Sequence, residues 1–277
     1  MKFTEAVKLL ENAGIENARG EARQIFMHFG GYDAASLMLT DAYSDDVEVQ
    51  NAVERRILRE PLQYILGTTY FANEVYHVTP DCLIPRPDTE ILVEYARANI
   101  PSGEHFIDLC TGSGCVAIST LTGTKNTTCE AVDISVGALD LATKNATLNG
   151  VADRIEFIRA DALSMPLGKD KPYAVLSNPP YVTEAEYSAL EKELYFEPKI
   201  ALVGADEGLE FYKGIVPLYK NRIKDDGFIA FEIGKDQAAA LTAISAEEGM
   251  QIEIIKDYQG HDRVAVLSQQ QPKSNTF

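Results

Sequence analysis

From about residue 104 onward, short runs of apolar residues alternate with amphipathic stretches. The apolar runs are rich in β-branched and aromatic residues, which favours strands, and the stretches between them repeat apolar positions at helical spacing. The predicted strands span residues 105–110, 127–135, 154–161, 173–178, 227–234, 251–259 and 262–269. Strands that alternate with helices predict a mostly parallel sheet covered on both faces. The residues "GHD" join the last two strands, so we expect an antiparallel hairpin at one edge of this α/β fold.

The first part of the chain has a different pattern. Residues 1 to about 75 repeat apolar positions at helical spacing, with glycines or a proline after each stretch. The residues that follow favour strand, with a turn at Pro80 and Asp81. These patterns predict a small helical domain at 1–75, a hairpin linker at 76–87 and an α/β domain at 88–277.

The composition matches that of a globular protein with a substantial core. Hydrophobic residues make up 45% of the chain and charged residues 24%. The absence of a long apolar run and of a signal-peptide pattern predicts a cytoplasmic protein without a membrane segment. The four cysteines show no C-x-x-C spacing, so we expect free thiols and neither a metal site nor disulfides. The polar residues 269–277 are expected to be disordered, and a monomer is expected because no surplus apolar surface helix is evident.

The formal net charge of −17 changes the expected partners. An acidic surface repels the phosphate backbone of nucleic acids, and the sequence has no cluster of lysines and arginines that would form a basic groove. Direct binding to nucleic acid is therefore not expected, and a small molecule or a protein partner is favoured.

A glycine-rich turn, "DLCTGSG", follows the first strand of the predicted sheet. Gly112 and Gly114 can adopt positive φ and let a ligand lie against the backbone. Ligands of open α/β sheets bind at this edge, near the point where the strand order reverses. The turn lacks the third glycine of dinucleotide sites and the lysine of phosphate-binding loops, so a nucleoside without phosphates fits best. The alternative is that both glycines serve only a tight turn.

Two further strands end in acidic residues at the same edge. Asp133, about 20 residues after the glycines, could bind a ribose diol. Asp161 could accept a hydrogen bond from the exocyclic amine of an adenine. Taken singly, Asp133 could only cap the next helix and Asp161 could be an ordinary loop acid. Taken together, the three strand ends predict a site for S-adenosylmethionine, which contains a nucleoside and no phosphate.

The fourth strand ends in "NPPY", residues 178–181. A proline has no N–H, so its carbonyl is a pure acceptor. Asn178 Oδ1 and the Pro179 carbonyl could accept the two N–H groups of a planar –NH2 group, on which Tyr181 could stack. The nitrogen would then be aimed at a methyl donor, with no strong base needed before attack. The alternative is a rigid turn, with Asn178 in an Asx-turn and Tyr181 in the core.

The pairing of "DLCTGSG" with "NPPY" resembles amino-methyltransferases that use S-adenosylmethionine, including adenine DNA and ribosomal RNA enzymes. More specific stretches are "EPLQYILG" (60–67), "LIPRPDTEILVE" (83–94), "FEPKIALVGADEGLEFY" (196–212), "FEIG" (231–234) and "GHDRVAVL" (260–267). With these, the chain from about residue 60 resembles the HemK-like (PrmC-type) protein-(glutamine-N5) methyltransferases, and the helical start is similar to that family's N-terminal domain. One departure is Cys110, where many relatives have glycine.

This resemblance implies a Rossmann-like, seven-stranded methyltransferase domain with an antiparallel edge strand, after a helical domain that docks the substrate protein. The implied reaction moves a methyl group from S-adenosylmethionine to the glutamine amide of the Gly-Gly-Gln motif in class 1 peptide chain release factors, leaving S-adenosylhomocysteine. The implied cofactor residues are Cys110, Thr111, Gly112, Ser113, Gly114, Asp133, Asp161, Ala162 and Asn178. The implied catalytic and substrate-binding residues are Asn178, Pro179, Pro180 and Tyr181.

Two other functions stay open as alternatives. One is methylation of adenine or guanine amino groups in DNA or RNA, which the net charge disfavours. The other is a non-catalytic partner protein on the same scaffold, which the intact "NPPY" and glycine turn disfavour. The roles of three further residues are undecided: Glu232 would line the substrate pocket or form a salt bridge, Arg86 could pair with an acid, and Glu197 is one such acid.

Overall fold

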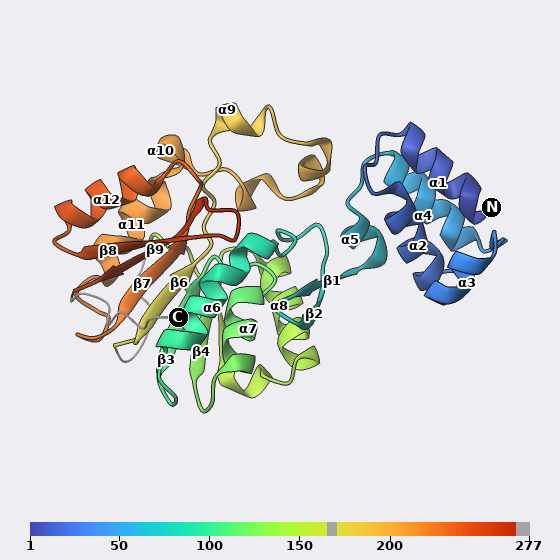
Figure 1. The fold of residues 1–277 in the computed structure, drawn as a ribbon. Helices are drawn as coiled ribbons and strands as arrows, with labels where there is room; N and C mark the ends of the chain where they lie inside the picture. Colours follow the sequence, from blue (N-terminus) through green and yellow to red (C-terminus); the bar gives the residue numbers. More distant parts are fainter. Residues whose placement is uncertain (165–170, 270–277) are drawn as a thin grey trace. The chain divides into compact units, whose positions relative to one another are not determined.

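The computed structural model describes residues 1–164 and 171–269. The chain forms two compact units, a helical unit and a larger α/β unit (Figure 1). The helical unit comprises Met1–Thr68 and Glu191–Phe196, and the α/β unit comprises Thr69–Leu190 and Glu197–Phe277. The tail expected to be disordered, 269–277, lies outside the described residues except for Gln269.

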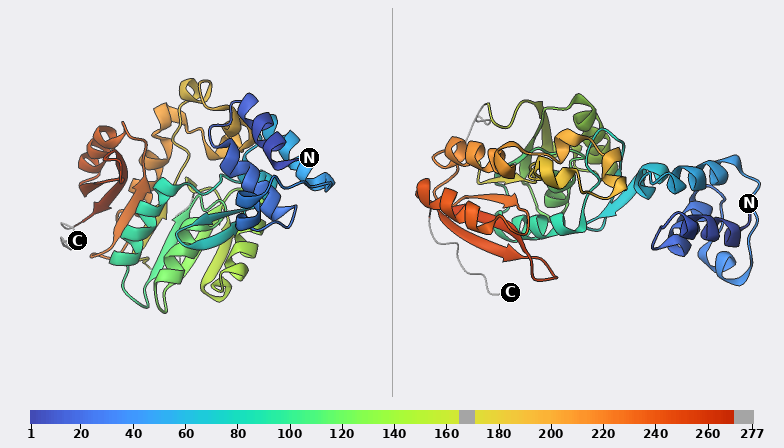
Figure 2. Two further views of the ribbon diagram at one scale, coloured as in Figure 1. Left: turned by 45° about the vertical axis from the view of Figure 1, so that its right-hand side comes forward. Right: turned by 90° about the horizontal axis from the view of Figure 1, so that it is seen from above.

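The helical unit has one core of its own. Its helices are α1 (Phe3–Asn12), α2 (Ala18–His28), α3 (Ala34–Leu39), α4 (Val47–Ile57) and α5 (Leu62–Leu66), drawn in blue tones in Figure 2. The apolar positions that repeat at helical spacing meet in this core, where Leu10, Ile25 and Val53 are fully buried. The helical pattern of the first residues is therefore explained by burial of one face of each helix.

A segment from much later in the chain also belongs to the helical unit. It contains the short 3-10 helix η3 (Lys192–Phe196). Arg56, whose side chain is 7% exposed, pairs with both Glu21 and Glu193, at 2.5 and 3.1 Å. Arg59 adds a second ion pair to Glu193 at 2.7 Å. These half-buried charges anchor the segment to the helices.

A β-hairpin precedes the position predicted for the linker. Strands β1 (Thr68–Phe71) and β2 (Glu74–His77) form a two-stranded sheet, so the hairpin ends where the predicted linker 76–87 begins. Its turn lies at Ala72 and Asn73, which adopt φ values of 49° and 74°. Asparagine tolerates this left-handed region better than most residues, which helps the chain reverse here. The predicted turn at Pro80-Asp81 is also present, closed by a hydrogen bond from the Cys82 N–H to the Thr79 carbonyl at 3.3 Å, but it does not join two strands.

The α/β unit is built on a seven-stranded sheet in the order β5-β4-β3-β6-β7-β9-β8. The strands are β3 (His105–Leu109), β4 (Thr128–Asp133), β5 (Ile155–Arg159), β6 (Ala174–Ser177), β7 (Phe228–Glu232), β8 (Gln251–Lys256) and β9 (Asp262–Ser268). Strands β3 to β7 pair in parallel, and β9 pairs antiparallel with both β7 and β8. The predicted mixed α/β fold with an antiparallel edge hairpin is confirmed. Strand β3 pairs with β4 and β6, so the strand order reverses at β3.

Helices cover both faces of this sheet (Figures 1 and 2). Helices α6 (Glu90–Asn99), α7 (Cys115–Gly123) and α8 (Val136–Leu148) pack on one face, against strand residues such as Phe106 and Leu176. Helices α11 (Glu210–Tyr219) and α12 (Ala238–Glu247) pack on the other face, against Ile107 and Val175. Strands β3 and β6 are buried on both faces, so most of their residues are apolar. Their buried polar residues, Asp108 and Ser177, are hydrogen-bonded.

Shorter elements connect these layers. They are η1 (Pro87–Thr89), η2 (Ala152–Arg154), α9 (Glu184–Tyr187), η4 (Lys199–Ala201) and α10 (Ala205–Gly208). All four cysteines, each within the described residues, are free thiols. Within 1–164 and 171–269, no helix combines the length and the apolar character needed to cross a membrane.

Candidate active site

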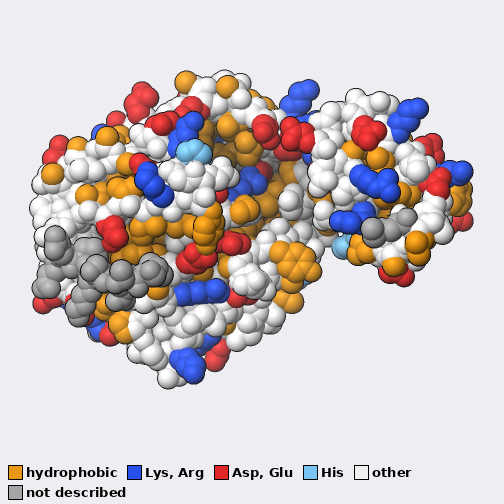
Figure 3. Space-filling view, in the orientation of Figure 1, with side chains coloured by type: hydrophobic (Ala, Val, Ile, Leu, Met, Phe, Trp, Pro, Cys, Tyr) orange, Lys and Arg blue, Asp and Glu red, His pale blue; other side chains and the backbone are white. Residues whose placement is uncertain are grey.

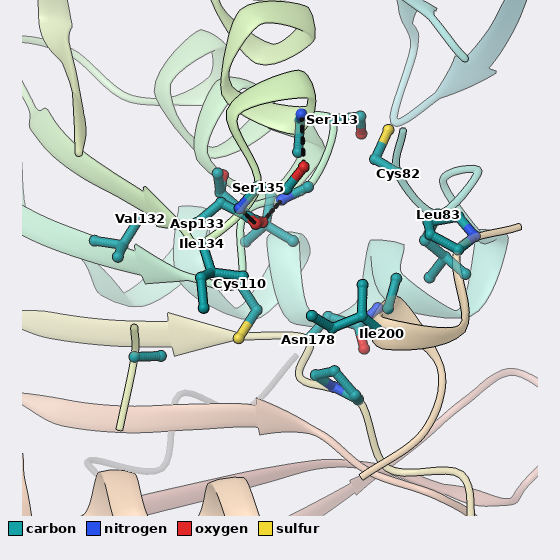
Figure 4. Close-up of a pocket in the computed structure, with 18 of the residues that line it drawn as sticks. Cys82, Leu83, Cys110, Ser113, Val132, Asp133, Ile134, Ser135, Asn178 and Ile200 are labelled. Carbon is teal, nitrogen blue, oxygen red and sulfur yellow. Dashed lines mark hydrogen bonds between the residues drawn. The ribbon is translucent and has the colours of Figure 1, made fainter. Parts of the chain in front are cut away.

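A cavity of about 290 Å³ lies at the carboxyl ends of β3, β4, β5 and β6. Most of the predicted cofactor residues line it: Cys110, Thr111, Gly112, Ser113, Asp133, Asp161, Ala162 and Asn178. Figure 4 shows Cys110 and Asp133 on one side of the cavity and Leu83, Asn178 and Ile200 on the other. The sheet therefore brings together strand ends that are far apart in the sequence, as parallel pairing requires.

The glycine turn is supported from below by a buried acid. Asp108, 1% exposed, accepts hydrogen bonds from Thr111 Oγ1 at 2.6 Å and from the Ala117 N–H at 3.1 Å. Burial raises the pKa of Asp108 to about 7. Asp108 thus ties the turn to the start of α7 and does not itself line the cavity, among the residues that the structure describes.

The two glycines of the turn have different roles. Both adopt positive φ, 54° at Gly112 and 81° at Gly114, and so does Cys110 with 59°. Gly112 lines the cavity, whereas Gly114 is not part of the described lining. A Cβ at Gly114 would lie 2.9 Å from Ile118 Cδ1 and 3.1 Å from Ala142 Cβ, so Gly114 allows α7 and α8 to pack closely.

Asp133 lines the cavity and also holds the loops around it. Its carboxylate accepts from the Gly112 N–H at 2.8 Å and from the Ser135 N–H at 2.9 Å (Figure 4). Burial raises the pKa of Asp133. Capping of the following helix comes instead from Ser135, whose hydroxyl accepts from the Ala138 N–H. A carboxylate has further lone pairs, so Asp133 can hold the loop and still accept from a ligand hydroxyl.

Asp161 is exposed in the loop after β5, and its Oδ1 accepts a hydrogen bond from the Leu163 N–H at 2.9 Å.

The charged side chains that line the cavity are mostly negative. Asp81, Asp133, Asp161 and Glu210 are part of the lining, together with a single arginine, Arg86. Such a cavity repels phosphate groups and attracts a cation.

Arg86 is not available as a free cation. It forms an ion pair with Glu197, whose side chain is 1% exposed. The second oxygen of Glu197 accepts from the Ile84 N–H at 2.9 Å. The roles of Arg86 and Glu197 were undecided from the sequence. In the structure they join the segment before α6 to the segment after η3, and these two segments form one wall of the cavity.

The "NPPY" turn leaves two acceptors unused. Asn178 is half-buried in the cavity wall, and Pro179 and Pro180 are buried. The hydrogen bonds of the described residues include none to Asn178 Oδ1 or to the Pro179 carbonyl. Pro180 lines the cavity, whereas Pro179 and Tyr181 are not among its described lining residues. The Tyr181 hydroxyl instead donates to Glu232 Oε1 at 3.1 Å.

A hydrogen-bonded chain lies behind Asn178. Its Nδ2 donates to Thr89 Oγ1 at 3.1 Å, and Thr89 Oγ1 donates to Glu232 Oε2 at 2.5 Å. Thr89 and Glu232 are 1% and 2% exposed, and burial raises the pKa of Glu232. Thr89 was expected only as a possible cap of the helix that follows it, but its side chain makes no cap hydrogen bond and binds Glu232 instead.

A ligand with cationic groups, a nucleoside and no phosphate fits this cavity. Asp133 and Asp161 offer acceptors for hydroxyl and amino groups, and Ile134, Leu83 and Ile200 offer apolar surface for a base. S-adenosylmethionine has a positively charged sulfonium and ammonium group, which matches the acidic lining. The residues present therefore fit this cofactor.

Comparison with known proteins agrees with the fold. Residues 3–67 match the family model described as "PrmC N-terminal domain", and residues 87–200 match "Methyltransferase small domain". The solved hMettl16 catalytic domain, in complex with MAT2A 3'UTR hairpin 6, superposes with a TM-score of 0.60 at 15% identity, covering 89% of this chain and 91% of that one. At this identity the likeness concerns the fold alone.

Two curated relatives extend over nearly the whole chain. The release factor glutamine methyltransferase of Thermodesulfovibrio yellowstonii is 36% identical, over 96% of this chain and 98% of the relative. The enzyme of the same name from Geobacter sulfurreducens is 35% identical, over 92% and 91%. Because these matches span both units of the fold, the chain belongs to the release factor glutamine methyltransferase family.

Proposed function

We propose that the protein transfers a methyl group from S-adenosylmethionine to the side-chain amide nitrogen of a glutamine, in the Gly-Gly-Gln motif of class 1 peptide chain release factors. The observation that carries this proposal is a pair of unused acceptors on consecutive residues. They are Asn178 Oδ1, on a residue that lines the acidic cavity, and the carbonyl of Pro179, the next residue in the chain. The names of the curated relatives support the same substrate.

The cavity would hold the cofactor through the residues predicted for it. Asp133 and Asp161 would accept hydrogen bonds from hydroxyl and amino groups of the cofactor. The backbone of the turn at Thr111–Ser113 would contact the cofactor directly, because Gly112 has no side chain. Gly114 would contribute by packing the helix, not by touching the ligand. When bound, the cofactor supplies an electrophilic methyl group.

The turn at 178–181 would orient the substrate amide. The two N–H groups of a glutamine –NH2 would donate to Asn178 Oδ1 and to the Pro179 carbonyl, and the prolines offer no competing donor. Fixing the nitrogen in line with the methyl group can lower a barrier by up to roughly 7–11 kcal/mol. The nitrogen becomes acidic as its new bond to carbon forms, so the proton can leave to water afterwards.

Tyr181 was expected to stack on the substrate amide, but its contacts support another role. Its hydroxyl is held by Glu232, and its ring packs with the apolar core. In the proposal Tyr181 therefore keeps the turn in place, and Pro180 forms part of the cavity wall.

The helical unit would dock the release factor, as a monomer with one site per chain. Its core is separate from that of the α/β unit, so it can present a surface without forming part of the cavity. This role rests on the match of residues 3–67 to the PrmC N-terminal domain.

Methylation of amino groups in nucleic acid is the competing function, because an adenine also presents a planar –NH2 group. The net charge of −17 disfavours it. On the face seen in Figure 3, the lysine and arginine side chains of the α/β unit are scattered among acidic ones and form no single basic patch.

The deciding experiment uses the full chain with methyl-labelled S-adenosylmethionine. Purified release factor, tRNA, ribosomal RNA and DNA are offered separately, and a release factor with the Gly-Gly-Gln glutamine changed to alanine is the control. Label should appear on the release factor and disappear with the changed glutamine. Label on a nucleic acid, with none on the release factor, would contradict the proposal.

A further inference from the structure

Two buried side chains outside the predicted site connect to Asn178. Glu232 lies at the end of β7 and Thr89 at the start of α6, so segments far apart in the sequence meet behind the "NPPY" turn. The chain runs from Glu232 Oε2 to Thr89 Oγ1, 2.5 Å apart, and from Thr89 Oγ1 to Asn178 Nδ2, 3.1 Å apart. Thr89 and Asn178 both line the cavity, and Glu232 lies behind them.

The polarity of this chain is set by the two hydroxyls that bind Glu232, because Tyr181 donates to Oε1 and Thr89 donates to Oε2. An ionised carboxylate can only accept hydrogen bonds. Thr89 must therefore use its single hydroxyl proton on Glu232, which leaves only lone pairs toward Asn178. The Asn178 group that faces Thr89 must then be the donor, Nδ2, and the acceptor Oδ1 is left for the cavity.

We propose that Glu232 and Thr89 are positioning residues, which fix the Asn178 side-chain amide in the one orientation that presents an acceptor to the substrate. A flipped amide would present Nδ2 and repel the N–H groups of a substrate –NH2. The two orientations of an amide have nearly the same shape, so packing alone cannot choose between them, whereas the direction of the hydrogen bonds can. The inference rests on the proposed function, since it explains how the acceptor for a substrate amide is maintained.

The same carboxylate also holds the other end of the turn. Tyr181 donates to Glu232 Oε1 at 3.1 Å, so both oxygens of one buried carboxylate bind the "NPPY" segment, one directly and one through Thr89. Arg263 bridges Asp88, next to Thr89, and Asp257, each at 3.2 Å. The stretches "LIPRPDTE" and "FEIG" thus supply the two side chains that bind the "NPPY" segment, and "GHDR" supplies the arginine that pairs with the acid next to Thr89.

The first test compares conservative variants on the full chain. Thr89→Val keeps the shape and removes the hydroxyl, and Thr89→Ser keeps the hydroxyl. We expect Thr89→Val and Glu232→Gln to lower kcat roughly 10- to 100-fold, the range for a buried hydrogen bond left unmade, with the KM for S-adenosylmethionine nearly unchanged. Thr89→Ser should retain most of the activity. Equal losses in Thr89→Ser and Thr89→Val, or a loss below twofold in Thr89→Val, would overturn the proposal.

A matched variant controls for general destabilisation. Tyr212 is fully buried and donates to the backbone carbonyl of Glu232 at 3.1 Å, not to its carboxylate. Tyr212→Phe should lower the melting temperature as much as Thr89→Val while leaving kcat largely intact. If kcat falls in proportion to stability across all of these variants, the residues are structural and the positioning role is refuted.

The second test does not depend on which substrate is methylated. The side-chain amide protons of Asn178 are assigned by NMR from their loss in Asn178→Asp. In the wild type and in Thr89→Ser, one of these protons should exchange slowly because Thr89 holds it, and in Thr89→Val it should exchange faster. Unchanged exchange would overturn the positioning role, even if release factor methylation is observed. If slow exchange is seen but no release factor is methylated, only the proposed function fails.

Discussion

Some residues at this site both hold the surrounding loops through hydrogen bonds and line the cavity. Asp133 clamps the backbone N–H groups of Gly112 and Ser135 and also lines the cavity. Asn178 is held through its Nδ2, which leaves its Oδ1 without a partner among the described residues. Asp133 and Asn178 therefore each combine contacts that hold the loops with a place in the cavity wall, and substitutions test their proposed roles.

Asn178→Ala and Asp133→Ala should affect different quantities, kcat in the first variant and cofactor affinity in the second. Removing the Asn178 acceptor should lower kcat roughly 100- to 1000-fold, as loss of a group that stabilises the reacting centre does. Cofactor affinity should stay within about threefold, or 0.6 kcal/mol. Asp133→Ala should mainly weaken cofactor affinity, because it removes an acceptor and releases the glycine turn. Calorimetry and single-turnover methyl transfer measure the two effects, and equal losses of affinity in both variants would contradict this division.

Asp108 should make stability depend on pH. Its pKa rises from 3.8 to about 7 on burial, so the folded protein holds this proton more tightly than the unfolded chain. The stability it contributes is complete below pH 3.8 and is lost as the pH rises through 7. Asp108→Asn cannot ionise, so relative to wild type it should gain roughly 2 to 4 kcal/mol between pH 4 and pH 8. Urea unfolding at both pH values measures this, and a constant difference would argue against it.

At the scale of elements, the segment 203–208 supports the "NPPY" turn from outside the cavity. The Val182 N–H donates to the Leu202 carbonyl at 2.9 Å, and the Gly204 N–H donates to the Val182 carbonyl at 3.0 Å. A Cβ at Gly204 would lie 2.4 Å from the Pro180 carbonyl oxygen, and one at Gly208 only 2.1 Å from that of Tyr181. Before Gly208, Asp206 and Glu207 both adopt φ values above 50°. A run of left-handed residues costs free energy, and here it lets two backbones approach closely.

Gly208→Ala should therefore damage both stability and methyl transfer. The substitution adds the strain of a φ of 77° and a clash with the Tyr181 carbonyl. Gly249→Ala is the matched control, because its φ is 69° and nothing lies within 4 Å of the added Cβ. The control should lose only about 1–2 kcal/mol from the left-handed conformation and keep its kcat. Gly208→Ala should lose more stability and also kcat; an equal effect of the two variants would refute the supporting role of this segment.

At the scale of the whole molecule, two cores share the chain. Every residue of the described cavity lining belongs to the α/β unit, whereas Leu10, Ile25 and their neighbours form the core of the helical unit. Cofactor binding and recognition of a substrate protein can therefore be disturbed separately.

Leu10→Ala tests this separation. Truncation of a fully buried leucine costs about 2–5 kcal/mol and should loosen the helical unit. Cofactor affinity measured by calorimetry should not change. Methylation of an intact release factor should fall, while methylation of a short Gly-Gly-Gln peptide should stay as it is in the wild type. A parallel loss on both substrates would show that the helical unit is not the docking domain.

Much of the fold and of the site could be predicted because it depends on local patterns. The strands β3 and β6 could be predicted because burial on both faces makes most of their residues apolar. The glycine turn, Asp133, Asp161 and Asn178 could be placed at one edge of the sheet from the sequence, because each lies at or just after the end of a parallel strand. Their roles toward a ligand stay predictions. The turn predicted at Pro80-Asp81 is present, whereas the hairpin turn at Ala72-Asn73 was not predicted because it contains no glycine or proline.

The sequence by itself determined the sheet with its two covered faces, the edge at which the cavity lies, and the lack of backbone donors at the two prolines of the turn at 178–181. Only the tertiary structure decided that Glu232 binds Thr89 and Tyr181, that Glu197 binds Arg86, and that Tyr181 turns away from the described cavity lining. The physical reason is the distance along the chain over which each kind of interaction acts. Periodicity and turn chemistry act between neighbours in the chain, whereas a buried carboxylate is satisfied by whichever donors the packed sheet and helices bring to it.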